Sequence, residues 1–306
     1  MHAIAGCHDT GDLPTATMNS IPAQPMKITE TALCFDCAGA SLYGVLSLPV
    51  EPARRGVLIV VGGPQYRAGS HRQFTLLARD LAAAGIPVMR FDYRGMGDSE
   101  GAARSYDDID VDLKAAIDIF FTSVPPLREV VLWGLCDGAS AAVFYAPSDP
   151  RVTGIVMLNP WLRTDAGAAR ARLKYYYPLR LLDRELWRKV LQGRLNFLVS
   201  LRFFASQLLK SMHSQGARHG ARRETLPVRM RKAFLKFDGK ILLIISGNDL
   251  TAKEFLDAVT ASSDWRNRLH SSTVSRHDLA AADHTFSKRE WRNQVAAWTT
   301  AWLHSW

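Results

Sequence analysis

The sequence lacks an uninterrupted apolar run long enough to cross a membrane. No such run in its 306 residues reaches the roughly 18 residues that a spanning helix needs. Residues 1–26 also lack a basic start followed by a continuous apolar core, so they do not resemble a secretory signal. We therefore expect a flexible leader at 1–26 and a cytoplasmic protein.

Cysteine is scarce as well, with four residues at positions 7, 34, 37 and 136. Cys34 and Cys37 form a C-x-x-C pair, but a zinc site needs two further ligands at suitable spacing, and no second pair exists. The pair lies in a strand-like run and not at a helix start, which argues against a redox motif. We interpret both as strand residues and expect neither a metal nor a cofactor.

Two phosphate-binding motifs are absent. Gly62-Gly63 follows a predicted strand, but neither G-x-x-x-x-G-K-[ST] nor G-x-G-x-x-G accompanies it. No recognised nucleic-acid-binding module is visible either, so nucleic acid is not an expected partner. A small-molecule or acyl substrate is the expected ligand.

Short apolar runs alternate with helical patterns along most of the chain. The runs at 56–61, 87–91, 130–133, 152–158 and 240–246 predict buried parallel strands, after a hairpin at 27–37 and 41–48. A last helix is predicted over 287–303, opened by a Ser287/Glu290 capping box. This alternation predicts the α/β class, with a mostly parallel sheet covered by helices on both faces.

Positive charge is concentrated in one segment, which divides the chain. The net charge is +9, yet residues 162–236 alone hold 18 Lys and Arg against four acids. Leucines at helical spacing predict that 162–236 is a basic helical lid insertion, between core parts at 27–161 and 237–306. A solvated helix face is one interpretation of the lid. The alternatives are that the lid binds peripherally to an anionic membrane or attracts an anionic substrate.

The stretch 129–145, EVVLWGLCDGASAAVFY, predicts a strand, a tight turn and a helix start. Cys136 stands in the turn, with Gly134 and Gly138 two residues to either side. A nucleophile on such a turn projects above the sheet from a strained backbone, and the glycines let strand and helix pass closely. Serine is the usual occupant, and a small buried thiol is the ordinary alternative for a free cysteine. The strand–turn–helix context favours Cys136 as the nucleophile.

A cysteine nucleophile needs a base, and the base needs an orienting acid. In this architecture the chain order is nucleophile, acid, base. Asp249 follows the strand predicted at 240–246, and His284 lies on the loop before the last helix. Their nearest rivals are Asp264, beyond the following helix, and His277, seven residues upstream of His284. Positions just past strand ends favour Asp249 as the acid and His284 as the base.

An oxyanion hole requires backbone N–H groups aimed at the developing negative charge. One predicted donor is Asp137, the residue after the nucleophile. The other comes from the loop after the strand at 56–61. Pro64 has no N–H, so Gly63 is the first candidate there and Gln65 the second.

By these residues the chain resembles the α/β-hydrolase superfamily, from about residue 27 to its end. Val61-Gly62-Gly63-Pro64 is similar to the H-G-x-P loop of that superfamily, with Val61 where His is usual. The turn at 92–99, DYRGMGDS, is similar to its D-x-R-G-x-G-x-S turn, and we expect it to be structural.

A closer resemblance is to the exosortase A system-associated hydrolases of the first type. It rests on four segments: Gly62-Gly63-Pro64-Gln65-Tyr66-Arg67, Gly69-Ser70-His71-Arg72-Gln73-Phe74, Gly134-Leu135-Cys136-Asp137-Gly138 and Asp283-His284-Thr285-Phe286-Ser287. The resemblance implies a link to exopolysaccharide production and protein sorting but no particular substrate. A Cys in the elbow also resembles dienelactone hydrolases and polyhydroxyalkanoate synthases.

A thiol in place of a hydroxyl changes the expected chemistry. A thiolate is intrinsically nucleophilic, and its acyl-enzyme is an activated thioester. We therefore expect a hydrolase acting on an ester or thioester through Cys136, His284 and Asp249. Two alternatives remain open: an acyltransferase using the same thioester, and a non-catalytic binding protein with this fold.

Overall fold

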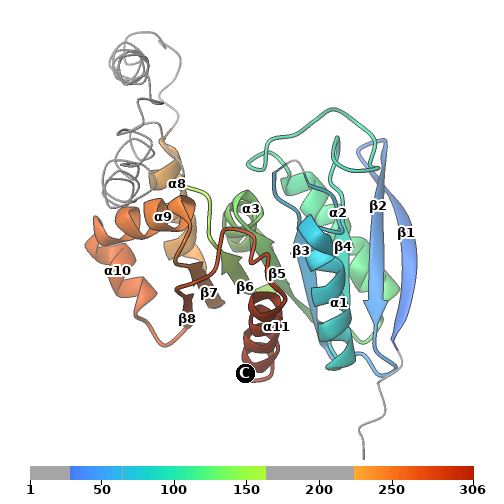
Figure 1. The fold of residues 1–306 in the computed structure, drawn as a ribbon. Helices are drawn as coiled ribbons and strands as arrows, with labels where there is room; N and C mark the ends of the chain where they lie inside the picture. Colours follow the sequence, from blue (N-terminus) through green and yellow to red (C-terminus); the bar gives the residue numbers. More distant parts are fainter. Residues whose placement is uncertain (1–27, 64, 163–223) are drawn as a thin grey trace, which may run out of the picture.

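The computed structural model describes residues 28–63, 65–162 and 224–306. Within these ranges the chain forms one eight-stranded sheet (Figure 1). Its strands are β1 (Thr29–Cys37), β2 (Ala40–Leu48), β3 (Arg55–Val60), β4 (Val88–Phe91), β5 (Glu129–Leu135), β6 (Val152–Leu158), β7 (Lys240–Ser246) and β8 (Val274–Leu279).

The strands lie in the order β1-β2-β4-β3-β5-β6-β7-β8. The hairpin of β1 and β2 is antiparallel and joins β4 in antiparallel pairing. Every neighbouring pair from β4 to β8 is parallel. The predicted mostly parallel sheet is confirmed, and the carboxyl ends of its parallel strands share one edge.

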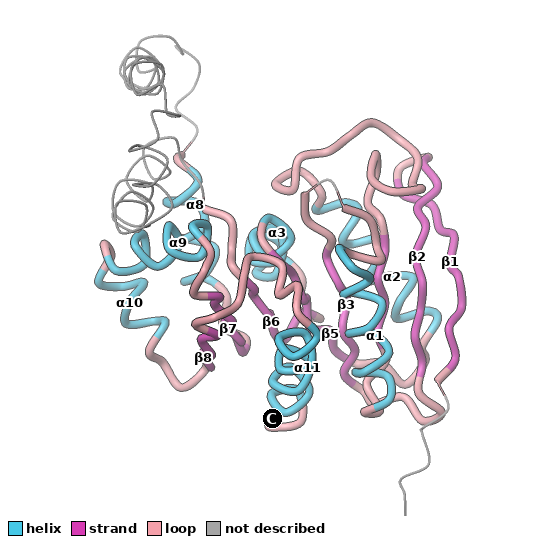
Figure 2. Tube along the Cα trace, viewed as in Figure 1, coloured by secondary structure: helices cyan, strands magenta, loops and turns pink. Residues whose placement is uncertain are grey.

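Helices cover both faces of the sheet, as predicted (Figure 2). One face carries α1 and α11, which contact each other. The other face packs against the remaining helices. The seven α-helices of the described residues are α1 (Gln73–Ala83), α2 (Asp110–Ser123), α3 (Asp137–Tyr145), α8 (Leu226–Lys236), α9 (Leu250–Thr260), α10 (Ser263–Leu269) and α11 (Arg289–Leu303).

The central strands are buried on both sides, which explains their continuous apolar sequences. Every residue of β5 after Glu129 is buried, and β6 and β7 are almost as enclosed. Register brings their ends together, since Val60 of β3 pairs with Gly134 and Leu135 pairs with Leu158 of β6. The residues that follow β3, β5, β6 and β7 are therefore neighbours in space.

Two features differ from the sequence-based expectations. The predicted capping box of the last helix is wrong: α11 begins at Arg289 with no side-chain cap. The Ser287 hydroxyl and N–H donate instead to the carboxylate of Asp283. Strand β8 was not predicted, because its sequence VSRHDL carries no apolar run and none of its residues is fully buried.

Most of the predicted lid, residues 163–223, lies outside the described residues. Its last part forms α8, whose Met230 and Phe234 are fully buried. Helix α8 packs against α3 and α10, so it belongs to the helical layer of the core. No helix of the described residues is long and apolar enough to cross a membrane.

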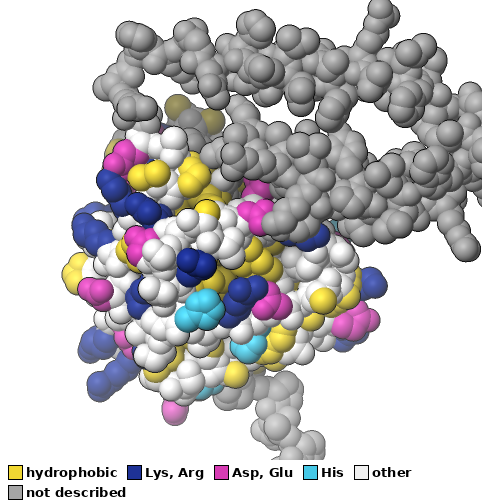
Figure 3. Space-filling view, turned by 90° about the vertical axis from the view of Figure 1, so that its left-hand side faces the viewer, with side chains coloured by type: hydrophobic (Ala, Val, Ile, Leu, Met, Phe, Trp, Pro, Cys, Tyr) yellow, Lys and Arg dark blue, Asp and Glu magenta, His cyan; other side chains and the backbone are white. Residues whose placement is uncertain are grey.

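Figure 3 shows one side of the molecule in space-filling form. On the coloured part of that surface, basic and acidic side chains are interspersed with small hydrophobic groups. The described residues of this face therefore carry charges of both signs.

Candidate active site

Cys136 occupies a strained turn between β5 and α3. Its backbone has φ 59° and ψ −123°, a left-handed φ that non-glycine residues rarely adopt. The turn is held by its neighbours: Cys136 N–H donates to Leu158 O at 2.9 Å, and Trp161 N–H donates to Cys136 O at 3.0 Å. Such strain persists only where surrounding structure enforces it, and it clusters at functional sites.

The flanking glycines are required by close backbone approach. A Cβ on Gly134 would collide with the backbone of Gly138 and Ala139, at the start of α3. A Cβ on Gly138 would collide with the carbonyl of Val60, at the end of β3. The G-x-C-x-G spacing therefore lets α3 begin directly against two strands, with Cys136 at the edge of the sheet.

Asp249 and His284 meet across the strand ends. His284 Nδ1–H donates to Asp249 Oδ2 at 2.8 Å. The same carboxylate caps α9, accepting from Thr251 N–H at 3.0 Å and Ala252 N–H at 3.2 Å. Asp249 is only 7% exposed, so these bonds fix both its position and its orientation toward the imidazole.

The charged form of His284 is favoured in this setting. Burial of the ring opposes protonation, but hydrogen bonds and charge interactions with Asp249 and Cys136 prevail and raise the pKa of His284 to about 10. An imidazolium beside the Cys136 thiol stabilises a thiolate, as in cysteine enzymes whose nucleophile is paired with histidine. His284 is therefore placed to exchange a proton with a group at Cys136.

Asn159 is a positioning residue that sequence reasoning missed. It follows β6, is fully buried and adopts a left-handed φ of 42°. Its side-chain N–H donates to His284 O at 2.9 Å, and its Oδ1 accepts from Ser246 N–H at 2.9 Å. Asn159 thus links the loop that carries His284 to Ser246 at the end of β7, three residues before Asp249. An Asn-Pro pair directly after a predicted strand was the available signal.

The predicted oxyanion donors have different surroundings. Gly63 N–H donates to Asp137 Oδ2 at 2.8 Å, so the carboxylate of Asp137 occupies that donor. Asp137 is the first residue of α3, where backbone N–H groups lack intrahelical partners. Gln65 lies on the same loop as Gly63, and its side-chain Oε1 accepts a hydrogen bond from Ser70 N–H at 3.4 Å. The structure brings Asp137 and Gly63 together, but the contact joins Gly63 N–H to the Asp137 carboxylate and does not leave two free N–H donors side by side.

The Asp137 carboxylate has a built cradle. A Cβ on Gly62 would overlap Asp137 Oδ1, so the absent side chain makes room for the carboxylate. Burial raises the pKa of Asp137, while N–H groups of Gly63 and Gly138 oppose the rise. A carboxylate next to the nucleophile is therefore held over the loop that should bind an oxyanion.

The two rival residues lie elsewhere. His277 in β8 stacks on Trp298 of α11, with ring centroids 4.5 Å apart. Asp264 is the second residue of α10, and its carboxylate accepts from the Ser262 hydroxyl and from Trp265 N–H. Neither has a bond to the His284–Asp249 pair.

The turn at 92–99 is structural, as expected. Arg94 forms a bidentate pair with the buried Asp112, at 2.9 and 2.8 Å, and Arg67 pairs with the buried Asp92.

Cys34 is exposed and Cys37 buried, three positions apart on β1, so they point to opposite faces. Among the described residues no group of His, Cys, Asp and Glu is arranged to hold a metal ion.

Part of the chain matches a family model and a curated relative. Residues 52–202 match the family described as serine aminopeptidase, S33. The quorum-quenching protein AidA of Acinetobacter baumannii is 27% identical over 180 residues, which cover 57% of this chain. That match spans only 56% of the length of AidA.

Solved structures share the fold. An esterase of Pyrococcus furiosus superposes with a TM-score of 0.61 at 15% identity, covering 91% of this chain and 92% of that one. Dienelactone hydrolase from Anabaena variabilis gives 0.55 at 16% identity, covering 91% and 98%. At these identities the likeness concerns the fold, and it confirms the predicted α/β-hydrolase fold. The narrower likeness to exosortase-associated hydrolases stays a prediction.

Proposed function

We propose that the chain, which has the α/β-hydrolase fold, cleaves esters or thioesters through a covalent intermediate on Cys136. One observation carries the proposal: a Cys on the strained elbow lies beside an imidazole that is bonded to Asp249 at 2.8 Å. These are the nucleophile, base and orienting acid of a triad.

The first half-reaction forms an acyl-enzyme. The Cys136 thiolate attacks the substrate carbonyl carbon, and the carbonyl electrons move onto oxygen. As the tetrahedral species collapses, the bond to the leaving alkoxide or thiolate breaks, and the His284 imidazolium supplies its proton. A thioester on Cys136 remains, with His284 neutral and Asp249 holding its Nδ1–H.

The second half-reaction releases the acid. Neutral His284 takes a proton from water as the water oxygen attacks the thioester carbonyl. Collapse expels the thiolate and restores the thiolate–imidazolium pair. An alcohol or amine in place of water gives the acyltransferase alternative, which the activated thioester makes chemically accessible.

The oxyanion needs donors that the resting site partly conceals. We assign one to Asp137 N–H at the start of α3, where the helix dipole also favours negative charge. The second is Gly63 N–H, which must first leave the Asp137 carboxylate. Asp137 side-chain movement is therefore part of the proposed cycle.

Substrate preference follows from the leaving group. A thiolate nucleophile is itself a good leaving group, so an attacked amide tends to revert. Thioesters and activated esters have leaving groups good enough to compete, and they are the substrates we propose. A binding protein with an inactive site is disfavoured, because it has no need to orient His284 through both Asp249 and Asn159.

Trapping the intermediate tests the proposal. Wild-type protein mixed with p-nitrophenyl acetate and quenched in acid should carry one acetyl group on the peptide that contains Cys136. Cys136→Ala should carry none and lose turnover, with an unchanged melting temperature. Cys136→Ser is the matched polar control and should retain at most weak esterase activity, because a hydroxyl depends more on its base. Full turnover by the Ala variant would exclude Cys136 as nucleophile.

A further inference from the structure

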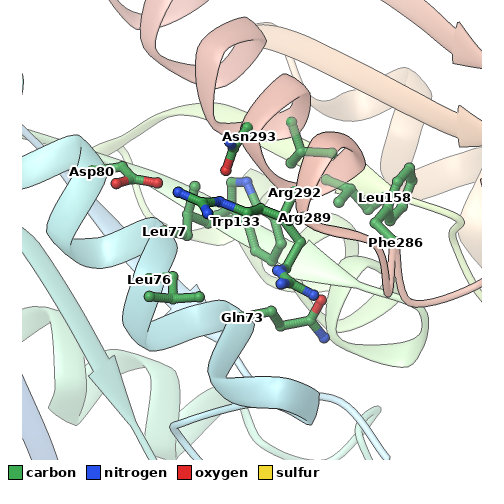
Figure 4. Close-up of a pocket in the computed structure, with 11 residues that line it drawn as sticks. Gln73, Leu76, Leu77, Asp80, Trp133, Leu158, Phe286, Arg289, Arg292 and Asn293 are labelled. Carbon is green, nitrogen blue, oxygen red and sulfur yellow. The ribbon is translucent and has the colours of Figure 1, made fainter.

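A cavity of about 280 Å³ lies between α1 and α11, on the sheet face opposite α3 (Figure 4). Figure 4 shows side chains of α1 facing side chains of α11 across it. None of Cys136, His284 and Asp249 lines this cavity. Its lining is Gln73, Leu76, Leu77, Asp80, Trp133, Leu158, Phe286, Arg289, Arg292, Asn293 and Val295.

Three N–H donors of this lining are buried without a partner. They are Gln73 Nε2, Trp133 Nε1 and Arg292 Nε. Gln73 is 8% exposed and Trp133 2%, so bulk water does not reach them freely. Buried donors are nearly always satisfied in folded proteins, and each unsatisfied one requires an explanation. A bound molecule with acceptor oxygens would satisfy all three.

The two ends of the cavity differ in charge. Helices α1 and α11 both begin at the edge where the parallel strands end, so Gln73 and Arg289, their first residues, mark the same end. Arg292 reaches back to that end, where it donates to Ser287 O. Asp80 lies seven residues along α1 from Gln73, about 10 Å at the rise of a helix. Gln73, at the start of α1, is thus separated from Asp80 along the cavity wall.

Apolar side chains line the space between these ends. The apolar lining residues are Leu76 and Leu77 of α1, Val295 of α11, Leu158 and Phe286. Asp80 forms no ion pair within the described residues, and burial raises the pKa of its carboxyl. A ligand chain directed toward Asp80 meets apolar surface first and the acid last.

We propose that this cavity binds a small carboxylic acid with a short apolar chain. The carboxylate accepts hydrogen bonds from Trp133, Gln73 and Arg292 beside the charge of Arg289, and the chain packs on Leu77 and its neighbours. This binding site does not depend on the proposed catalytic reaction.

The position of the cavity gives the ligand a route to the catalytic loop. Phe286 lines it and lies two residues after His284, in a left-handed conformation with φ 52°. Trp133 lies three residues before Cys136 on β5. A ligand packed on both residues acts as an effector of the catalytic loop and not as a substrate.

Hexanoate is the probe, with hexanol and hexylamine as chain-matched comparisons, in calorimetric titrations of the full chain. The catalytic thiol is first alkylated with iodoacetamide, which removes binding at the active site. Hexanoate should bind at least about tenfold more tightly than either comparison, because only it offers a charged acceptor. Equal binding of hexanol, or loss of hexanoate binding on alkylation, would overturn the proposal.

Trp133→Phe removes the buried N–H and keeps an aromatic ring. It should weaken hexanoate by at least about fivefold, whereas the lost ring volume at a buried position should lower the melting temperature without unfolding the protein. Trp298→Phe is the matched control, because Trp298 stacks on His277 and does not line the cavity. Equal affinities of the two variants, or no hexanoate binding by wild type, would show a cavity that holds only water.

Discussion

Replacing Asp137 with alanine should accelerate acyl-enzyme formation. In the resting site Gly63 N–H donates to the Asp137 carboxylate at 2.8 Å, in the space that Gly62 leaves free. A hydrogen bond to a charged group contributes about 1.5–3 kcal/mol. If Gly63 must break this bond before it can stabilise an oxyanion, that free energy adds to the barrier. Removing the carboxylate then gives a reaction about 10- to 100-fold faster, at roughly 1.4 kcal/mol per tenfold.

The assay is the pre-steady-state burst of p-nitrophenol that follows mixing with excess p-nitrophenyl acetate. Asp137→Asn is the matched control, because it keeps the shape and a neutral acceptor of about half the strength. We expect the burst to be fastest in Asp137→Ala, slower in Asp137→Asn and slowest in the wild type. Loss of the acidic residue from the first turn of α3 should cost about 0.3–1 kcal/mol of stability, visible as a small fall in melting temperature. A burst rate that falls tenfold in the Ala variant would mean that the carboxylate positions the loop, and an unchanged rate would exclude Gly63 as a donor.

Three further predictions concern the base, its titration and the basic segment. His284→Ala should lower turnover by at least ~10²-fold, whereas His277→Ala should leave it nearly unchanged; the reverse order would mean that the wrong histidine was chosen. Because the pKa of His284 is raised from 6.5 to about 10, its contribution to the free energy of unfolding should be complete below pH 6.5 and lost as pH rises toward 10. Urea unfolding should show that Asp249→Asn flattens this dependence, and an equally steep loss in the variant would contradict the assignment. We also predict that the protein binds anionic vesicles peripherally through the basic segment 162–236. This binding should weaken as salt rises, because charges are screened beyond about 8 Å at physiological ionic strength. Cosedimentation should show reduced binding after charge reversal to Glu at Arg184, Arg188 and Lys189, and equal binding to neutral vesicles would favour a solvated lid.

The buried strands and the positions of Asp249 and His284 at strand ends were predictable because they depend on local sequence. Apolar runs marked β5, β6 and β7, and the rule of nucleophile, acid and base in chain order selected Asp249 and His284, which the structure places in contact. Edge strand β8 was not predictable, because a half-exposed strand carries no continuous apolar signal.

Features that depend on contacts between distant segments could not be predicted either. The bond from Gly63 to the Asp137 side chain joins residues 74 positions apart, and that from Asn159 to His284 joins residues 125 positions apart. Sequence spacing places backbone donors, but it does not indicate which side chain will occupy them. The predicted capping box failed for a local reason, since Asp283, four residues earlier, accepts the hydrogen bonds of Ser287.

The buried amide of Asn159 joins two stretches of chain that residues 163–223 separate. The nucleophile and both proposed oxyanion donors precede that segment, and the acid and base follow it. The halves meet through the pairing of β6 with β7 and through the two hydrogen bonds of Asn159. The proposed nucleophile and the Asp249–His284 pair are thus brought together by noncovalent contacts between the two stretches. Fragments that end at 162 and begin at 224 would each hold one part of the proposed site.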